Sequence, residues 1–145
     1  MTQQPEVAAV LGGGSFGTAM ATILAQNGHT VRLWVRDPET AAAINNDHEN
    51  PRYLPGTELP EGVQASEDLI ECLSGASMVF MAVPSKAFME VLTQARDHVP
   101  EGTLVISCTK GIYADGFLLM SQLLVREWPH TLSLIHISEP TRRYA

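Results

Sequence analysis

The feature that most constrains this chain is a short apolar run that ends in glycines and is followed by a helix-forming segment. Residues 7–11 read VAAVL, which is typical of a strand covered on both faces of a sheet. Residues 15–26 are rich in Ala, Met, Ile and Leu and predict a helix that ends at Asn27-Gly28. A strand, a tight glycine turn and a helix in this order indicate the first unit of a parallel sheet.

The rest of the chain repeats this alternation of strand and helix. We expect strands at 30–35, 63–65, 78–83 and 103–108, and helices at 38–46, 66–73, 85–97 and 117–127. Ser66 is the expected N-cap of its helix, and the proline-containing stretch 47–62 is long enough, at about 16 residues, to suggest a functional loop. The order of elements predicts an α/β fold, a doubly wound parallel sheet of the Rossmann type with helices on both faces.

Ligands of such sheets bind beyond the carboxyl ends of the strands, and the first strand ends in a motif suited to that place. Gly12, Gly14 and Gly17 satisfy the pattern G-x-G-x-x-G. In such a motif the first glycine permits the tight turn, the second lets a pyrophosphate approach the backbone, and the third lets the helix pack on the strand. The start of the helix adds free N–H groups and a partial positive charge. This context predicts dinucleotide binding, with a glycine-rich turn that holds no ligand as the alternative.

The end of the second strand bears on which cofactor is bound. Enzymes that prefer NAD usually carry Asp or Glu there, bonded to the ribose 2′-hydroxyl, whereas this chain has Arg36 followed by Asp37. A guanidinium can hold a 2′-phosphate with two bonds and stack on adenine. Arg36 therefore favours NADP over NAD, while Asp37 argues in the other direction. A solvated charge pair at a strand end is the alternative.

A lysine also stands where the ligand crevice is expected. Lys110, one of two lysines in the chain, follows the predicted strand 103–108. A cation at that end of the sheet faces the crevice, where it can hold a phosphate or an anionic substrate. On spacing alone, a plain surface lysine is an equal alternative.

Composition bounds the class of partner. The 145 residues are the size of one domain and carry a formal net charge of −7. An acidic surface repels nucleic acid and anionic lipid, so we expect neither as a partner. No apolar segment reaches the roughly 18 residues that a membrane span needs. Cys72 and Cys108 match no metal-binding spacing and fit free thiols in a reducing compartment, so we expect a cytoplasmic protein without a metal site.

Several segments taken together resemble one family. Their order and spacing, over about residues 7–130, are those of bacterial NAD(P)-dependent glycerol-3-phosphate dehydrogenase, and together they are far more specific than the glycine motif. The segments are Val10 to Ala19, Asn27 to His29, Leu33 to Asp37, Asn50 to Pro55, Ala82 to Ser85 and Thr109 to Gly111.

The resemblance implies an oxidoreductase that interconverts dihydroxyacetone phosphate and sn-glycerol 3-phosphate with NAD(P), for phospholipid synthesis. It also implies that Lys110 contacts the phosphorylated substrate and that the full-length enzyme is a homodimer. Tyr53 gives the long loop 47–62 a purpose, although packing of that loop is an alternative role. The residues that the resemblance places at the cofactor are Ser15, Phe16, Arg36, Tyr53 and Lys110.

The resemblance fades near the end of the chain. Glu139 stands where the family carries a small glycine, and residues 134–145 resemble translated sequencing-adapter sequence. We interpret 1–133 as the dinucleotide-binding domain and 134–145 as an aberrant tail. In the family a further, helical domain supplies the catalytic lysine, and we expect that domain to be missing here. We therefore assign no catalytic residue and expect the chain alone to bind cofactor without turnover.

Three other interpretations stay open. A different dehydrogenase of this architecture, such as a ketopantoate reductase or a hydroxyacid dehydrogenase, should share the glycine loop but lack 50–55 and 109–111 together. A methyltransferase should carry an acidic residue in place of Arg36. A non-catalytic nucleotide-binding module is the alternative outside the enzymes.

Overall fold

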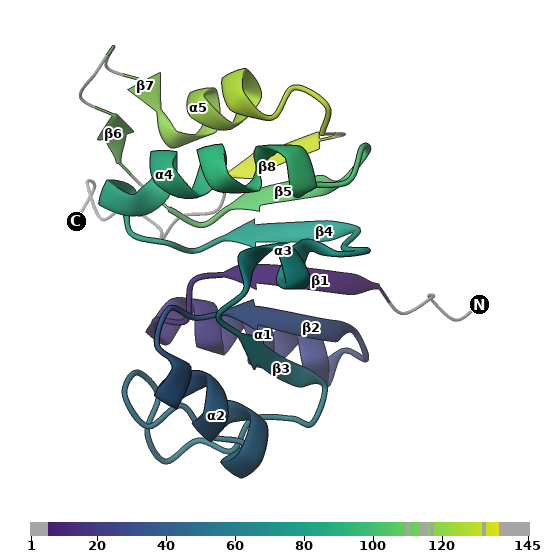
Figure 1. Cartoon of the computed structure of the whole chain (residues 1–145), viewed down its shortest axis with the longest axis vertical. Coiled ribbons are helices and arrows are strands. Elements are labelled where there is room, and N and C mark those ends of the chain that lie inside the picture. Colours follow the sequence, from purple (N-terminus) through teal and green to yellow (C-terminus); the bar gives the residue numbers. More distant parts are fainter. Residues whose placement is uncertain (1–5, 110, 114–115, 117, 132, 137–145) are drawn as a thin grey trace, which may run out of the picture.

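A sheet of six parallel strands forms the framework of the chain (Figure 1). This computed structural model describes residues 6–109, 111–113, 116, 118–131 and 133–136. The strands lie in the order β3-β2-β1-β4-β5-β8, and each neighbouring pair is parallel. From β1 the sheet extends through β2 and β3 on one side and through β4 and β5 on the other, which confirms the predicted doubly wound topology. The strands are β1 (Val7–Leu11), β2 (Thr30–Trp34), β3 (Val63–Ser66), β4 (Met78–Met81), β5 (Leu104–Ser107) and β8 (Ser133–His136).

Helices cover both faces of this sheet. Two of them pack on one face and three on the other, where a short 3-10 turn at Arg96–His98 extends the middle one. None of the described helices has the length and apolar character of a membrane span. The first pair is α1 (Ser15–Gln26) and α2 (Pro38–Asp47), and the other three are α3 (Leu69–Leu73), α4 (Ser85–Ala95) and α5 (Met120–Glu127).

The continuous apolar sequence of β1 follows from its place at the centre of these layers. Side chains alternate across a strand, so Ala8 and Val10 lie in the core under α1 and α2, while Ala9 and Leu11 lie in the core under α3, α4 and α5. All four residues are fully buried. A strand with two buried faces needs apolar residues at every position, which is the pattern that predicted it.

The chain after β5 differs from the sequence prediction. The expected helix 117–127 begins only at Met120, because Leu118–Leu119 forms a short strand, β7, antiparallel to β6 (Ile112–Tyr113). The side chain of Gln122 then accepts the backbone N–H of Leu119 at 2.8 Å. Strand β8 was not predicted. It pairs with β5 from Leu104↔Ser133 to Ser107↔His136, so the first residues of the segment set apart as a tail continue the sheet. That the tail is foreign to the family stays a prediction.

The start of α3 is also different, because Asp68 and not Ser66 is its N-cap. The carboxylate of Asp68 accepts the backbone N–H groups of Ile70 at 3.0 Å and Glu71 at 3.2 Å. The Ser66 hydroxyl lies one step earlier and accepts the N–H of Asp68 at 3.0 Å. A carboxylate two residues further along the chain is therefore the group that satisfies the free donors of the first turn.

We predict that Asp68→Ala lowers the free energy of unfolding by about 1 kcal/mol, the usual cost of losing an N-cap. Ser66→Ala, the matched control, should cost less because the Ser66 hydroxyl accepts no backbone N–H of the first turn of α3 and only donates to the Glu71 carboxylate, at the long distance of 3.5 Å. Urea unfolding followed by circular dichroism measures both. A larger loss in Ser66→Ala than in Asp68→Ala would show that the serine is the functional cap.

Candidate functional site

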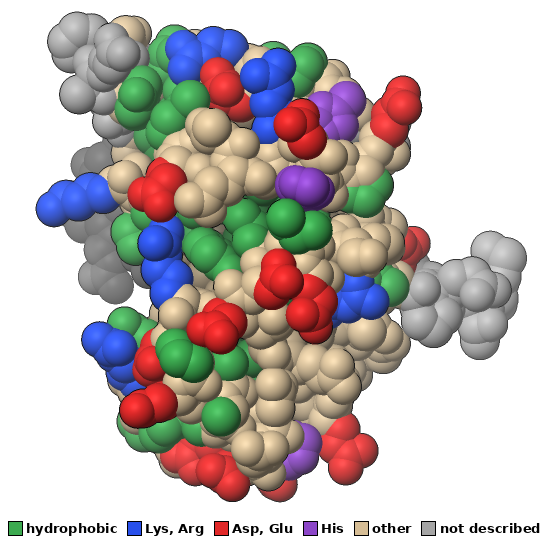
Figure 2. All heavy atoms as spheres, in the orientation of Figure 1, with side chains coloured by type: hydrophobic (Ala, Val, Ile, Leu, Met, Phe, Trp, Pro, Cys, Tyr) green, Lys and Arg blue, Asp and Glu red, His purple; other side chains and the backbone are tan. Residues whose placement is uncertain are grey.

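The candidate site is a cavity of about 330 Å³ where strands β1, β2 and β4 end. Its walls come from the glycine loop 12–14, the segment 34–37 after β2, the segment 82–84 after β4, and Arg52 and Tyr53 from the long loop. The sheet winds away in both directions from β1 and β4, so the cavity lies at the switch point where such sheets bind ligands. In Figure 1 the strands end on the left, and Figure 2 shows basic side chains along that side of the molecule.

The packing of the glycine loop requires glycine at two positions of the motif. Gly12 has a φ of +125°, and a Cβ there would stand 2.5 Å from the carbonyl oxygen of Ala82. A Cβ on Gly17 would stand 1.9 Å from the carbonyl oxygen of Gly12. The glycine between them, Gly14, is different, because no atom beyond its neighbours in the chain lies within 4 Å of the Cβ position. The space beside Gly14 is open to the cavity, so a ligand can approach the backbone there.

The segment after β2 presents the cation of Arg36 to the cavity, whereas the carboxylate of Asp37 is bonded to helix α2. The Arg36 guanidinium lies over the Trp34 ring, 5.1 Å from the ring centroid. Asp37 is the N-cap of α2: its carboxylate accepts the Thr40 hydroxyl at 2.8 Å and the Glu39 N–H at 3.2 Å. The Thr40 hydroxyl, and next the Glu39 N–H, hold the pKa of the Asp37 carboxyl below its ordinary value. Asp37 thus stays ionised, and both of its oxygens already serve α2.

The long loop contributes Tyr53, as the sequence predicted, and also Arg52, which sequence reasoning missed. Tyr53 is 42% exposed, and the Arg52 guanidinium lies 5.3 Å from the centroid of its ring. The Ser15 hydroxyl donates to the Tyr53 carbonyl at 2.7 Å, which ties the loop to the start of α1. The signal for Arg52 was its place beside Tyr53 in a long loop, but only the fold shows that it lines the same cavity as Arg36.

Three of the predicted cofactor residues, Ser15, Phe16 and Gly17, are not part of the cavity wall. Phe16 is 49% exposed on the first turn of α1 and does not line the cavity. Lys110 lies outside the described residues. The residue before it, Thr109, is buried, and its hydroxyl bonds to the carbonyls of Met81 at 3.2 Å and Val83 at 2.6 Å. These bonds fix the end of β5 beside the end of β4.

The two cysteines are free thiols that the fold keeps protonated. Burial, and next the carboxylate of Glu71, raises the pKa of Cys72 to about 12. Burial raises the pKa of Cys108 to about 11. A thiol reacts as the thiolate, so neither cysteine is a nucleophile near neutral pH.

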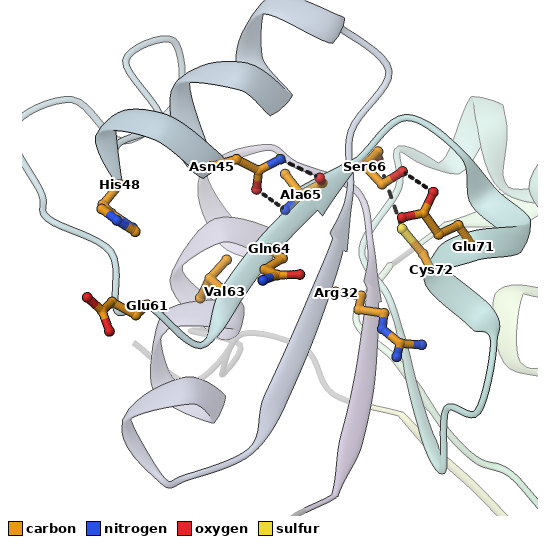
Figure 3. Close-up of a pocket in the computed structure, with 10 residues that line it drawn as sticks. All are labelled: Arg32, Asn45, His48, Glu61, Val63, Gln64, Ala65, Ser66, Glu71 and Cys72. Carbon is orange, nitrogen blue, oxygen red and sulfur yellow. Dashed lines mark hydrogen bonds between the residues drawn. The ribbon is translucent and has the colours of Figure 1, made fainter.

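A second cavity, also of about 330 Å³, opens along the outer edge of the sheet beside β3 (Figure 3). Its lining is polar, and Asn45 reaches across it to β3. The Asn45 amide donates to the Ala65 carbonyl at 2.8 Å and accepts the Ala65 N–H at 2.7 Å. The side chain therefore pairs the outward backbone groups of an edge strand, which protects that edge. This cavity runs along β3 at the edge of the sheet and not at the switch point between β1 and β4, so the first cavity is the candidate site.

Known proteins share both the sequence and the fold. Residues 7–142 match the family described as NAD-dependent glycerol-3-phosphate dehydrogenase N-terminus. A glycerol-3-phosphate dehydrogenase [NAD(P)+] of Alcanivorax borkumensis is 72% identical over 131 residues, which are 90% of this chain and 38% of that protein. The crystal structure of glycerol-3-phosphate dehydrogenase from Coxiella burnetii has a TM-score of 0.81 and 33% identity, over 88% of this chain and 39% of that one. The yeast enzyme, from Saccharomyces cerevisiae, also has a TM-score of 0.81, at 27% identity over 93% of this chain and 41% of that one.

The chain covers only part of the length of each of these relatives. The chain spans 38% of the length of the Alcanivorax relative, so the shared part is the N-terminal region. The match to this family, which spans most of the sequence, separates the chain from ketopantoate reductases and methyltransferases. The chain belongs to the NAD-dependent glycerol-3-phosphate dehydrogenase family, of which it carries the N-terminal domain.

Proposed function

We propose that this chain is the dinucleotide-binding part of an enzyme that interconverts dihydroxyacetone phosphate and sn-glycerol 3-phosphate. The observation that carries the proposal is the open space beside Gly14, in a cavity at the switch point of the sheet. The first N–H groups of α1 have no partners one turn earlier in the helix, and its dipole makes this end positive. Together they provide a place for a pyrophosphate.

The residues present fit an NAD(P) molecule whose pyrophosphate lies at the glycine loop and whose adenosine ribose lies at the end of β2. The backbone at Gly14 would hold the phosphates, and Arg36 with Trp34 would border the ribose. When bound, the cofactor supplies or accepts the hydride at the substrate carbon. Lys110, by the family pattern, holds the substrate phosphate. The protein's task in this domain is therefore to bind and orient the cofactor.

We also propose that the site prefers NADP to NAD. Both Asp37 oxygens are engaged at the start of α2, so the carboxylate is less available for the ribose 2′-hydroxyl than its place after β2 suggests. Arg36 and Arg52 line the same cavity, and two guanidinium groups favour an additional phosphate. The charged side chains at this end of the site have a positive net charge, although the net charge of the whole chain is negative.

We propose the substrate, the oligomeric state and the compartment of the enzyme from its family. The substrate class is a three-carbon phosphate, and the full-length enzyme is proposed to be a homodimer. The two free thiols and the acidic charge are in keeping with a cytoplasmic protein. Light scattering of the full-length enzyme tests the dimer directly.

We predict that Gly14→Val abolishes NADPH binding while the domain stays folded. The backbone of Gly14, with φ −72° and ψ −171°, suits any residue, and a side chain there would fill the space left for the phosphates. Gly17→Val is the matched control, because its Cβ would overlap the Gly12 carbonyl and should destabilise the fold by about 3 kcal/mol. NADPH fluorescence titration and thermal unfolding measure the two effects. A folded Gly14→Val protein that binds NADPH normally would contradict the proposed pyrophosphate site.

We predict that Arg36→Ala weakens NADPH binding by on the order of 1–3 kcal/mol, as expected for a charge-assisted pair, and leaves NADH binding nearly unchanged. Arg52→Ala should weaken NADPH binding in the same direction but less. Arg126→Ala, which removes an exposed charge from α5 away from the cavity, controls for net charge. Titration with both cofactors measures the ratio of affinities. Equal wild-type affinities for NADPH and NADH, or an unchanged ratio in Arg36→Ala, would rule out the proposed preference.

A further inference from the structure

Asn50 lies beneath the glycine loop and is completely buried. A buried amide must have hydrogen-bond partners, and this one uses both ends. Its Nδ2 donates to the Gly13 carbonyl at 3.0 Å and to the Thr18 hydroxyl oxygen at 2.9 Å. Its Oδ1 accepts the backbone N–H of Tyr53 at 3.2 Å. One side chain therefore joins the glycine loop, helix α1 and the turn that carries Tyr53.

The bond to Gly13 fixes the direction of a peptide group in the phosphate-binding loop. The Gly13 carbonyl accepts Asn50 Nδ2 and also the Thr18 hydroxyl, at 3.3 Å. In a trans peptide the carbonyl and the following N–H point in opposite directions, and the described residues contain no cis peptide bond. The N–H of Gly14 therefore points away from Asn50. Gly14 lines the cavity, and the space at its Cβ position is open.

Asn50 also anchors the turn that brings Arg52 and Tyr53 to the cavity. Its backbone carbonyl accepts the Leu54 N–H at 2.9 Å, so residues 50–54 close into a turn. The Tyr53 carbonyl accepts the Ser15 hydroxyl, which adds a second link to the start of α1. Arg52 and Tyr53, which line the cavity, are thereby held at a set place relative to the glycine loop.

We propose that Asn50 is a positioning residue for dinucleotide binding. It keeps the Gly13–Gly14 peptide turned so that the Gly14 N–H serves the pyrophosphate, and it holds Arg52 and Tyr53 at the same cavity. Asn50 itself does not line the cavity and acts through these groups. The inference rests on the proposed function, because it assumes that a dinucleotide occupies this cavity.

The test compares Asn50→Ala with Asn45→Ala. Asn45 also makes two hydrogen bonds from its amide to backbone, but on the edge of β3 beside the other cavity. Both variants should unfold at a lower temperature than the wild type. Only Asn50→Ala should bind NADH more weakly, by about tenfold, which corresponds to 1.4 kcal/mol. NADPH affinity should fall at least as much, since the Arg52 turn is released as well.

NADH is the informative probe because it shares the pyrophosphate with NADPH but lacks the 2′-phosphate. Arg36→Ala should leave NADH binding nearly unchanged, so a loss of NADH affinity separates the role of Asn50 from that of the cations. Unchanged NADH binding in a folded Asn50→Ala protein overturns the inference, and so does an equal loss in Asn45→Ala. A wild-type chain that binds neither cofactor instead contradicts the proposed function.

Variants of Thr18 test the same proposal independently if Asn50→Ala does not fold. Thr18 is fully buried, and Thr18→Val keeps nearly the same shape while removing the hydroxyl shared with Asn50 and Gly13. We expect weaker NADH binding in Thr18→Val and recovery in Thr18→Ser, which restores the hydroxyl. NADH binding that is unaffected in Thr18→Val, or not recovered in Thr18→Ser, counts against the orientation of the Gly13–Gly14 peptide as the cause.

Discussion

The close approach of helix α1 to the turn after β1 is the contact on which the site depends. A Cβ on Gly17 would lie 1.9 Å from the Gly12 carbonyl oxygen, so the helix sits at a distance that only glycine permits. Gly12 in turn abuts the backbone at Ala82, beyond β4. The ends of β1 and β4 and the start of α1 therefore meet at one point. The positive end of the helix faces the switch point of the sheet because of this packing.

The distribution of charge at the end of β2 is a consequence of local helix chemistry. Asp37 precedes Pro38, which suits the first turn of a helix, and its carboxylate caps that turn. The Asp37 carboxylate, the acidic group that would favour NAD at this position, is thus bonded to the first turn of α2. Trp34 meanwhile supports the Arg36 guanidinium with its ring and donates its own N–H to the Glu67 carbonyl at 3.0 Å. A chain with a net charge of −7 thereby presents cations at the end of β2.

The sequence predicted the parts of the fold that have a repeating physical signature. The apolar run 7–11, the glycine spacing and the alternation of strand and helix determine the sheet, and these predictions are confirmed. Strand β8 was not predicted, because the resemblance to the family fades near residue 134. Arg52 and Asn50 escaped notice for another reason. The Asn50 amide donates to Gly13 and Thr18, which lie 37 and 32 residues away in the sequence, and Arg52 meets Arg36 at the cavity only through the fold. The spacing of apolar residues in a sequence does not predict contacts between residues that are far apart along the chain.

The long loop 47–62 obtains its shape from side-chain and backbone bonds in place of regular secondary structure. His48, which ends α2 with a φ of 55°, accepts the Leu59 N–H through its carbonyl at 2.7 Å, and Leu59 is buried. The Glu49 carboxylate accepts the Gly56 N–H at 3.1 Å. These bonds close the loop upon itself, and Asn50 joins it to the phosphate-binding turn. A loop of this kind has a defined position because its backbone polar groups are satisfied internally. The side chains of Arg52 and Tyr53 therefore reach the cavity as part of the fold.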